Sequence, residues 1–122
     1  MKKNFLLIED NPGDIELTKI RFEDLNFEYD LKVFENGTDA KDFLSQTNEK
    51  FDLIFLDLLL GDMNGFEILK MIKESSSLKD VPVAAFHSGA SLEHYEKEYN
   101  IKPDLYIEKP IDTKIIENYI NN

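Results

Sequence analysis

Short apolar runs alternate along the chain with longer segments whose apolar residues recur at helical spacing. Runs of this length and composition are typical of strands that are buried on both faces of a parallel sheet. The expected strands cover residues 5–8, 29–34, 53–57, 81–86 and 105–107. Alternating strands and helices predict an α/β fold in which helices cover both faces of one parallel sheet.

The segments between these strands carry helix signals. A break at Asn11-Pro12-Gly13 starts the first helix, with Asp14 at or near its N-terminus. Asn36-Gly37 is predicted to be a turn before the second helix, and a serine cluster at 75–77 closes the third. The remaining helices are expected around residues 92–99 and 115–120.

Three acidic residues and one lysine stand where the expected strands end. Glu9 and Asp10 follow the first strand, Asp57 ends the third, and Lys109 comes just after the fifth. Open α/β sheets hold ligands at the carboxyl ends of their strands. A carboxylate in such a place is costly unless a cation or hydrogen bonds compensate it. The pattern therefore predicts a site for a cation and a phosphate.

These residue types permit a specific chemistry. If the first and third strands are neighbours, Glu9, Asp10 and Asp57 supply the hard oxygen ligands that Mg²⁺ prefers. Asp57 can then attack phosphorus as a nucleophile and form an acyl phosphate. Lys109 offers a movable positive charge to the phosphoryl oxygens.

Each residue also has a purely structural interpretation. Asp10 with Asn11 can form a turn ahead of the first helix, and Asp57 can cap a turn or a helix. Lys109 alone can be a solvated lysine. The shared position of the acids and the lysine at one edge of the sheet favours the functional interpretation.

Composition narrows the class of protein. A length of 122 residues predicts a single domain, residues 1–122, with no output domain. The net charge of −11 argues against nucleic-acid binding. The apolar runs are far shorter than the roughly 20 residues of a membrane span, and no signal-peptide pattern is found, so we expect a cytoplasmic protein that does not bind membranes. The absence of cysteine excludes disulfides and thiolate metal sites.

The chain resembles the receiver domains of bacterial two-component response regulators over residues 4–121. The similar segments are 7–14, 52–57, 64–67, Pro82-Val83 and 106–110, the last with the family's lysine and cis proline. The resemblance implies a flavodoxin-like (βα)5 fold with a five-stranded parallel sheet in the order 2-1-3-4-5. It implies a signalling module that catalyses at most its own phosphorylation and dephosphorylation.

The resemblance assigns roles at the strand ends. Glu9 and Asp10 are expected to bind Mg²⁺, Glu9 largely through water, and Asp57 to accept phosphate while also binding the metal. The backbone carbonyl of Leu59 is expected to complete the metal shell. Lys109 is expected to contact the phosphoryl oxygens.

Tyr106 corresponds to the aromatic switch of the family, which turns inward when phosphate is bound. The family has Thr or Ser at the end of the fourth strand, and that position, counted from Pro82, is His87, followed by Ser88. Either the strand end is shifted and Ser88 serves, or His87 replaces the hydroxyl. The spacing from Asp57 favours His87, because it needs no insertion. Its ring N–H can donate to a phosphoryl oxygen, or the histidine simply fills the strand end.

Two other departures from the family lie in the loop after Asp57. Gly61 stands where the family usually has proline, which predicts a looser loop. Leu59 is apolar at a position thought to tune hydrolysis of the acyl phosphate, so the lifetime of the phosphorylated state is not predicted.

The leading hypothesis is a stand-alone receiver, a monomer or weak dimer, that takes phosphate from a histidine kinase or phosphotransfer protein. It would signal to a downstream protein through the face of the fourth helix, fifth strand and fifth helix. The alternative is a pseudo-receiver, an interaction module with an altered or lost switch at His87. The complete set of three acids and Lys109 argues against that alternative. An aspartyl phosphatase would need an acid at Leu59, and a flavodoxin would need a hydroxyl- and glycine-rich loop instead of Glu9-Asp10.

Overall fold

In the part of the chain that the structure describes, five strands alternate with five helices, as predicted. The structure is a computed structural model, and it describes residues 2–87 and 92–121. The elements are β1 (Lys3–Ile8), α1 (Pro12–Phe22), β2 (Tyr29–Phe34), α2 (Gly37–Gln46), β3 (Leu53–Asp57), α3 (Gly65–Glu74), β4 (Val83–His87), α4 (Glu93–Tyr99), β5 (Leu105–Glu108) and α5 (Thr113–Asn121). Within these described ranges, every helix is too short or too polar to cross a membrane.

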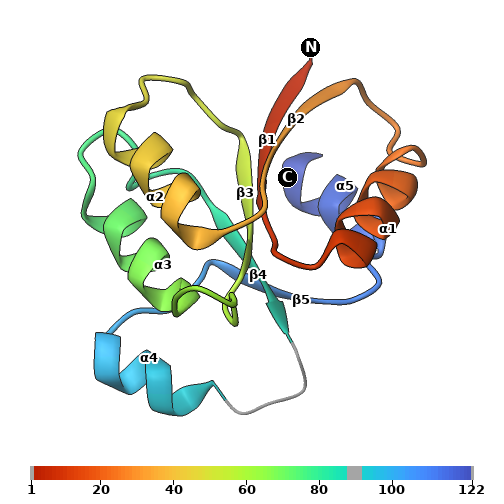
Figure 1. Cartoon of the computed structure of the whole chain (residues 1–122). Coiled ribbons are helices and arrows are strands. Elements are labelled where there is room, and N and C mark those ends of the chain that lie inside the picture. The colour runs from red at the N-terminus through yellow and green to blue at the C-terminus, as the bar shows by residue number, and fades with distance from the viewer. Residues whose placement is uncertain (1, 88–91, 122) are drawn as a thin grey trace.

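The strands form one parallel sheet in the order β2-β1-β3-β4-β5, which confirms the expected fold class (Figure 1). In the register, Ile8 of β1 lies beside Leu56 of β3, and Asp57 lies beside Phe86 of β4. Helices α1 and α5 lie on one side of the sheet, and α2 and α3 lie on the other (Figure 1). Since all strands run in the same direction, the ends of β1, β3 and β5 meet at one edge.

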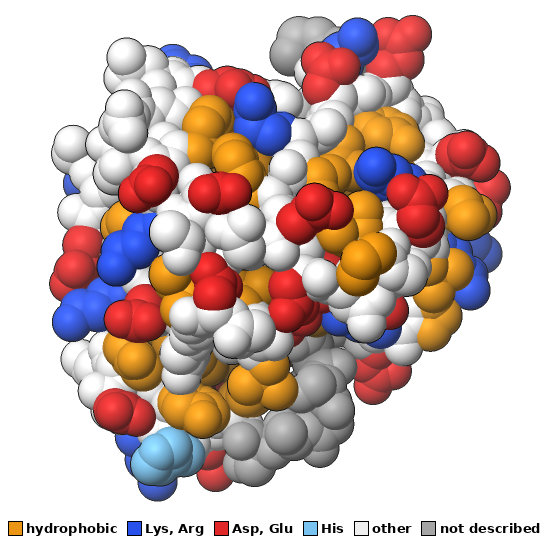
Figure 2. Space-filling view, viewed as in Figure 1, with side chains coloured by type: hydrophobic (Ala, Val, Ile, Leu, Met, Phe, Trp, Pro, Cys, Tyr) orange, Lys and Arg blue, Asp and Glu red, His pale blue; other side chains and the backbone are white. Residues whose placement is uncertain are grey.

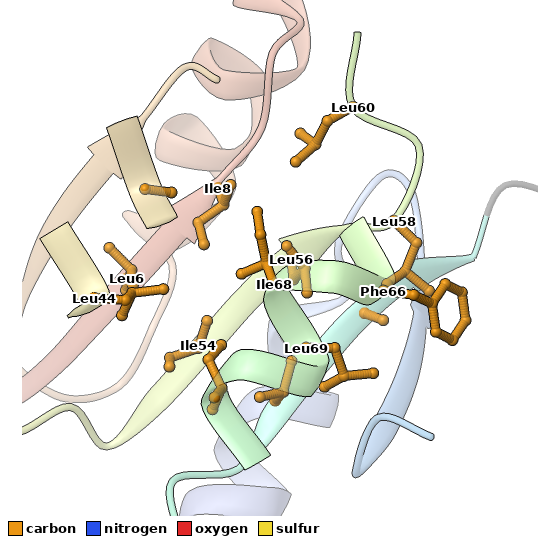
Figure 3. Packing of buried hydrophobic residues seen from close by; sticks show 14 of the residues in the cluster. Leu6, Ile8, Leu44, Ile54, Leu56, Leu58, Leu60, Phe66, Ile68 and Leu69 are labelled. Carbon is orange, nitrogen blue, oxygen red and sulfur yellow. The ribbon is translucent and has the colours of Figure 1, made fainter. Parts of the chain in front are cut away.

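The central strands send alternate side chains into two separate cores, because successive residues of a strand point to opposite faces. The α1/α5 core contains Phe5, Leu7, Ile15, Phe22, Leu53, Phe55, Ala84, Phe86, Ile107, Ile111 and Ile116. The α2/α3 core includes Leu6, Ile8, Leu44, Ile54, Leu56, Leu58, Leu60, Phe66, Ile68 and Leu69 (Figure 3). Each fully buried Leu, Ile or Phe side chain among them stabilises the fold by about 1.5–3 kcal/mol. Burial on both faces therefore fixes the register of the strands that carry the site.

Asparagine side chains start three of the helices. Asn11 accepts a hydrogen bond from the backbone N–H of Asp14, and Asn64 accepts one from the N–H of Phe66 at the start of α3. Asn36 caps α2, and Gly37 is its first residue. The prediction of a turn at Asn36-Gly37 was therefore wrong in one respect: the pair begins a helix, because the Asn36 side chain satisfies a free N–H of its first turn.

Gly65 lets α3 begin directly on the strand end that carries Asp57. Its N–H donates to the carbonyl oxygen of Leu58 at 2.9 Å. A Cβ at this position would lie 2.6 Å from both the Asp57 carbonyl oxygen and the Leu58 Cα. These contacts are with backbone atoms, which cannot move aside without distorting the end of β3.

We expect Gly65→Ala to lower the free energy of unfolding by about 1–3 kcal/mol, because the added methyl group overpacks this junction. Urea denaturation measures the change. Gly13→Ala in α1 is the matched control, since its Cβ would meet only the Asn11 side-chain oxygen, at 3.2 Å. An equal loss in the two variants would contradict the close packing of α3 on β3.

Candidate functional site

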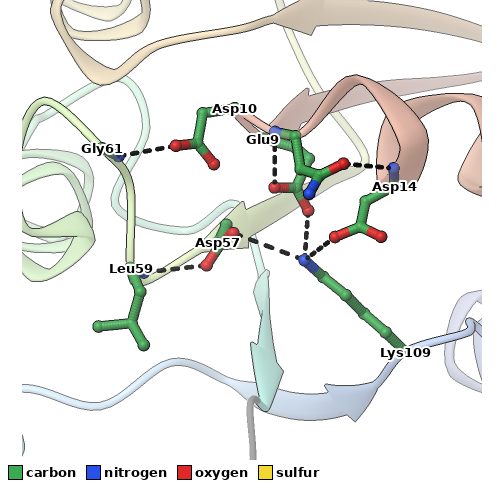
Figure 4. Close-up of polar contacts among 8 residues, drawn as sticks. Glu9, Asp10, Asp14, Asp57, Leu59, Gly61 and Lys109 are labelled. Atoms are coloured by element: carbon green, nitrogen blue, oxygen red, sulfur yellow. Dashed lines mark hydrogen bonds and ion pairs between the residues drawn. The ribbon is translucent and has the colours of Figure 1, made fainter.

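The strand alternation decides the side of the sheet to which each candidate residue belongs. Glu9, Asp57 and Lys109 each stand two residues after a strand residue of the α1/α5 core. Asp10 stands two residues after Ile8, which belongs to the α2/α3 core. Figure 4 shows the result: the Lys109 side chain reaches Glu9 and Asp57, whereas the Asp10 side chain points toward Gly61.

Lys109 is surrounded by carboxylates. Its Nζ lies 2.5 Å from Glu9 Oε1, 3.0 Å from Asp14 Oδ2 and 3.5 Å from Asp57 Oδ2. Its Nζ also lies 5.0 Å from the centre of the Phe86 ring. Partial burial acts to lower the pKa of Lys109, but the contacts with the three acids outweigh it and raise that pKa above its usual value. The lysine is therefore held in its charged form at the end of β5.

Glu9 is the most buried acid of the site, with 1% of its surface exposed. Burial raises its pKa to about 7, the nearby Asp57 carboxylate acts in the same direction, and Lys109 opposes them. Its Oε2 accepts a hydrogen bond from the Asn11 N–H at 3.3 Å. Among the described residues, the buried Oε1 has the ion pair with Lys109 but accepts no hydrogen bond of regular geometry. Lys109 therefore compensates this buried oxygen through its charge.

Asp10 and Asp57 each have one oxygen fixed by a backbone N–H. Asp10 Oδ2 accepts from Gly61 at 2.8 Å, and Asp57 Oδ1 accepts from Leu59 at 2.9 Å. One oxygen each from Glu9, Asp10 and Asp57 all lie within 4.8 Å of one another. Oxygen ligands at this spacing fit a small hard cation such as Mg²⁺.

The loop after Asp57 exposes Leu59, whose side chain is 46% accessible, while its N–H binds Asp57. The loop brings backbone groups to the site, as the role expected for the Leu59 carbonyl requires. That role itself stays a prediction.

Tyr106 lies on the opposite side of the sheet from Lys109 and packs against the α2/α3 core. Its hydroxyl donates to Glu96 Oε2 of α4 at 2.7 Å. Burial and this hydrogen bond raise the pKa of Tyr106 above its usual value. The contact joins β5 to α4, the elements expected to form the signalling face.

His87 is the last residue of β4, and its backbone pairs with Glu108 of β5. The strand therefore extends one residue beyond the predicted end, to the position counted from Pro82. Ser88 lies outside the described residues, and so does the His87 side chain. The roles expected for these two residues stay predictions.

One residue of the site was not identified from the sequence. Asp14 was interpreted only as a helix-start residue, yet its carboxylate hydrogen-bonds Lys109. The available signal was its position in the first turn of α1, directly after the Glu9-Asp10 pair. A side chain there points back toward the strand end from which the helix departs.

Comparison with known proteins gives a family match and related chains. Residues 5–121 match the family described as "Response regulator receiver domain". The chain is 29% identical to the "Probable transcriptional regulator ycf29" of Pyropia yezoensis, over 100% of this chain and 53% of the relative. It therefore spans about half the length of that relative. It is 27% identical to the "Polar-differentiation response regulator DivK" of Brucella anthropi, over 100% of this chain and 99% of the relative.

Solved structures show the same architecture. The bacteriophytochrome response regulator RtBRR matches with a TM-score of 0.79 and 30% identity, covering 99% of this chain and 77% of that one. The phosphorylated cyanobacterial phytochrome response regulator RcpA matches at 0.78 and 26%, covering 98% and 89%. The Mn²⁺-bound form of response regulator Rcp1 matches at 0.76 and 27%, covering 97% and 88%. The family match extends over nearly the whole chain, and the strand order agrees with it: the chain belongs to the response regulator receiver domain family.

Proposed function

We propose that this receiver domain accepts a phosphoryl group on Asp57, with Mg²⁺ bound by Glu9, Asp10 and Asp57. The observation that carries the proposal is that Asp57 belongs to a three-carboxylate cluster and also lies beside Lys109. The cluster has the spacing of a divalent-cation site. Lys109 Nζ lies 3.5 Å from Asp57 Oδ2.

The proposed donor is the phosphohistidine of a histidine kinase or of a phosphotransfer protein. An Asp57 oxygen forms the new bond to phosphorus, the P–N bond of the donor breaks, and the leaving imidazole takes the bonding electron pair. Bound Mg²⁺ supplies charge neutralisation to the carboxylates and the phosphoryl oxygens. Lys109 stays cationic because of its raised pKa, and it faces the negative charge that the acyl phosphate adds.

Local charge explains why a divalent cation is needed. Glu9, Asp14 and Asp57 surround Lys109, and Asp10 lies close by, so one lysine offsets only part of the negative charge. Figure 2 shows acidic side chains across the middle of the face that it draws, in keeping with the net charge of −11. A phosphate group approaching this surface without a cation is repelled.

The comparisons support the proposal at the level of the family. RcpA was solved as a phosphorylated protein, and Rcp1 was solved with Mn²⁺, a divalent cation that also prefers oxygen ligands. Both structures share the fold of this chain at 26–27% identity. The spacing of oxygens from Glu9, Asp10 and Asp57 allows the same two functions here.

We propose that residues 1–122 act as one signalling unit whose output is binding to another protein through α4, β5 and α5. Tyr106 is the proposed switch residue, and inward rotation of its ring breaks the hydrogen bond to Glu96. His87 or Ser88 is the proposed donor to the phosphoryl group at the end of β4. Phosphorylation would then change the surface where α4 meets β5.

Phosphorylation by a small donor tests the proposal directly. We expect acetyl phosphate with Mg²⁺ to add one phosphoryl group to the wild-type chain, detected by intact-protein mass spectrometry. The adduct should be lost on treatment with hydroxylamine, as an acyl phosphate is. Asp57→Asn should reduce the modification to background, because its amide is not a nucleophile toward phosphorus.

Asp52→Asn is the matched control, since it makes the same chemical change just before β3, where Asp52 accepts a hydrogen bond from the Asn4 N–H. It should be phosphorylated like the wild type. Undiminished modification of Asp57→Asn would contradict the assignment of the phosphoacceptor. A wild-type chain that neither binds Mg²⁺ nor accepts phosphate would contradict the proposed function.

Mg²⁺ affinity should depend on pH through Glu9. Below its pKa of about 7 this carboxyl is neutral, and its proton must leave before the carboxylate can help hold the cation. We therefore expect affinity to fall by up to about tenfold per pH unit below pH 7 and to level off above it. Titration calorimetry between pH 6 and 8, in two buffers of different ionisation enthalpy, measures both the affinity and the released protons.

Glu9→Gln is the control, because it keeps the side-chain shape and removes the titrating group. Its Mg²⁺ affinity should be weaker at pH 8 and nearly independent of pH over this range. A wild-type affinity that stays constant from pH 6 to 8 would show that Glu9 does not titrate with metal binding.

A further inference from the structure

Gly61 makes a hydrogen bond that the proline usual at this position of the family cannot make. Its backbone N–H donates to Asp10 Oδ2 at 2.8 Å, and proline has no N–H. The sequence predicted only that the glycine loosens the loop. In the structure, this residue ties the loop to one of the three carboxylates of the proposed metal site (Figure 4).

The neighbouring residue, Asp62, fixes the same loop to α2. Its Oδ1 accepts from the Gly37 N–H at 2.9 Å, and its Oδ2 accepts from the Thr38 N–H and hydroxyl at 2.9 and 2.8 Å. These N–H groups belong to the first helical turn, where the helix itself provides no acceptors. The hydrogen bonds lower the pKa of Asp62, so its carboxylate stays charged at the start of α2.

The loop is fixed on the other side of Gly61 as well. The Leu60 side chain is buried in the α2/α3 core, with 8% of its surface exposed. Leu59 and Asn64 form an isolated β-bridge that closes the loop. Gly61 therefore stands between two anchored neighbours, and the position of its N–H is set by the fold.

We propose that the Gly61 N–H is a positioning donor for the metal site. It holds one oxygen of the Asp10 carboxylate, fixes the rotation of that group and leaves its other oxygen for the cation. Asp62 contributes indirectly, because it holds the loop that carries this N–H. The inference rests on the proposed function, since it requires a cation at Glu9, Asp10 and Asp57.

The physical basis is preorganisation. A carboxylate that is already fixed loses less rotational freedom when it binds a metal than one that rotates freely. Groups that orient a metal ligand in this way typically change metal affinity by 10- to 100-fold when they are removed. The opposite effect is competition: if the cation must break the Gly61–Asp10 bond in order to bind, removing the N–H strengthens binding.

Two substitutions of Gly61 separate the N–H from the effect of added bulk. A Cβ at this position would lie 3.0 Å from Asp10 Oδ2. Gly61→Ala and Gly61→Pro both add this carbon, but only proline removes the N–H. Their difference reports the loss of the hydrogen bond together with the fixed φ of proline, so hydrogen exchange of the wild-type chain checks the bond itself.

The test measures Mn²⁺ binding to the full chain, with free Mn²⁺ counted by electron paramagnetic resonance. We expect Gly61→Pro to bind Mn²⁺ about tenfold more weakly than Gly61→Ala. Circular dichroism melts establish that both variants are folded. Equal affinities of the two variants, or tighter binding by the proline variant, would overturn the positioning role.

A second measurement needs no variant. Amide hydrogen exchange of the wild-type chain, followed by NMR, should show that the Gly61 N–H stays protected when Mg²⁺ is added. Faster exchange with Mg²⁺ would mean that the cation breaks the bond, and would overturn the inference. If the wild type binds Mn²⁺ and Gly61→Pro equals Gly61→Ala, only this inference fails. If the wild type binds neither Mn²⁺ nor Mg²⁺, the proposed function fails and the inference fails with it.

Discussion

Glu9 is held with 1% of its surface exposed beside a second carboxylate, Asp57, and the structure of the site follows from the need to compensate these two charges. A lone buried carboxylate neutralises itself by taking up a proton, as the raised pKa of Glu9 indicates. Lys109 counters this tendency at 2.5 Å from Glu9 Oε1. Lys109 reaches these carboxylates from the end of β5, which is separated from β3 by β4.

Lys109 compensates the negative charge of the carboxylates only in part, and the charge that remains suits the site to its proposed role. Lys109 divides one positive charge among three carboxylates. A fully neutral cluster would have little affinity for a divalent cation, and a cluster without Lys109 would force its acids to protonate. The partial balance keeps Asp57 close to Lys109 while the pKa of Glu9 is about 7. The proposed sensitivity of metal binding to pH follows from the same balance.

Much of the fold was predictable because its signals are local. The apolar runs at 5–8 and 53–56 indicated burial on both faces, and alternate residues do enter two cores. The strand order is non-local: it depends on which runs pair across helices, and the resemblance to the receiver family supplied it. The start of α2 was misjudged because Asn36-Gly37 serves equally well as a turn and as a helix cap.

The residues of the candidate site that stand at strand ends were predictable from the sequence. The groups that form hydrogen bonds with them were not. Glu9, Asp57 and Lys109 follow apolar runs, so position along the chain marks them. The bond from Lys109 to Asp14 joins residues 95 positions apart, and the position of Asp14 in the first turn of α1 was its one local signal. The bond from Gly61 to Asp10 is made by a backbone N–H, which every residue but proline carries, so its direction depends on the fold of the loop.

Alternate side chains of a strand point to opposite sides of the sheet, and this places Lys109 and the proposed switch residue Tyr106 on different sides. Lys109 belongs to the α1/α5 side, whereas Tyr106, three residues earlier, packs on the α2/α3 side and binds Glu96 of α4. A change at Asp57 therefore cannot reach Tyr106 through Lys109 without crossing the sheet. Strand β4 lies between β3 and β5, with Phe86 beside Asp57 and the backbone of His87 paired with Glu108. In the proposed mechanism the end of β4 connects the two sides of the sheet, so the residue at position 87 is expected to affect switching more than phosphorylation itself.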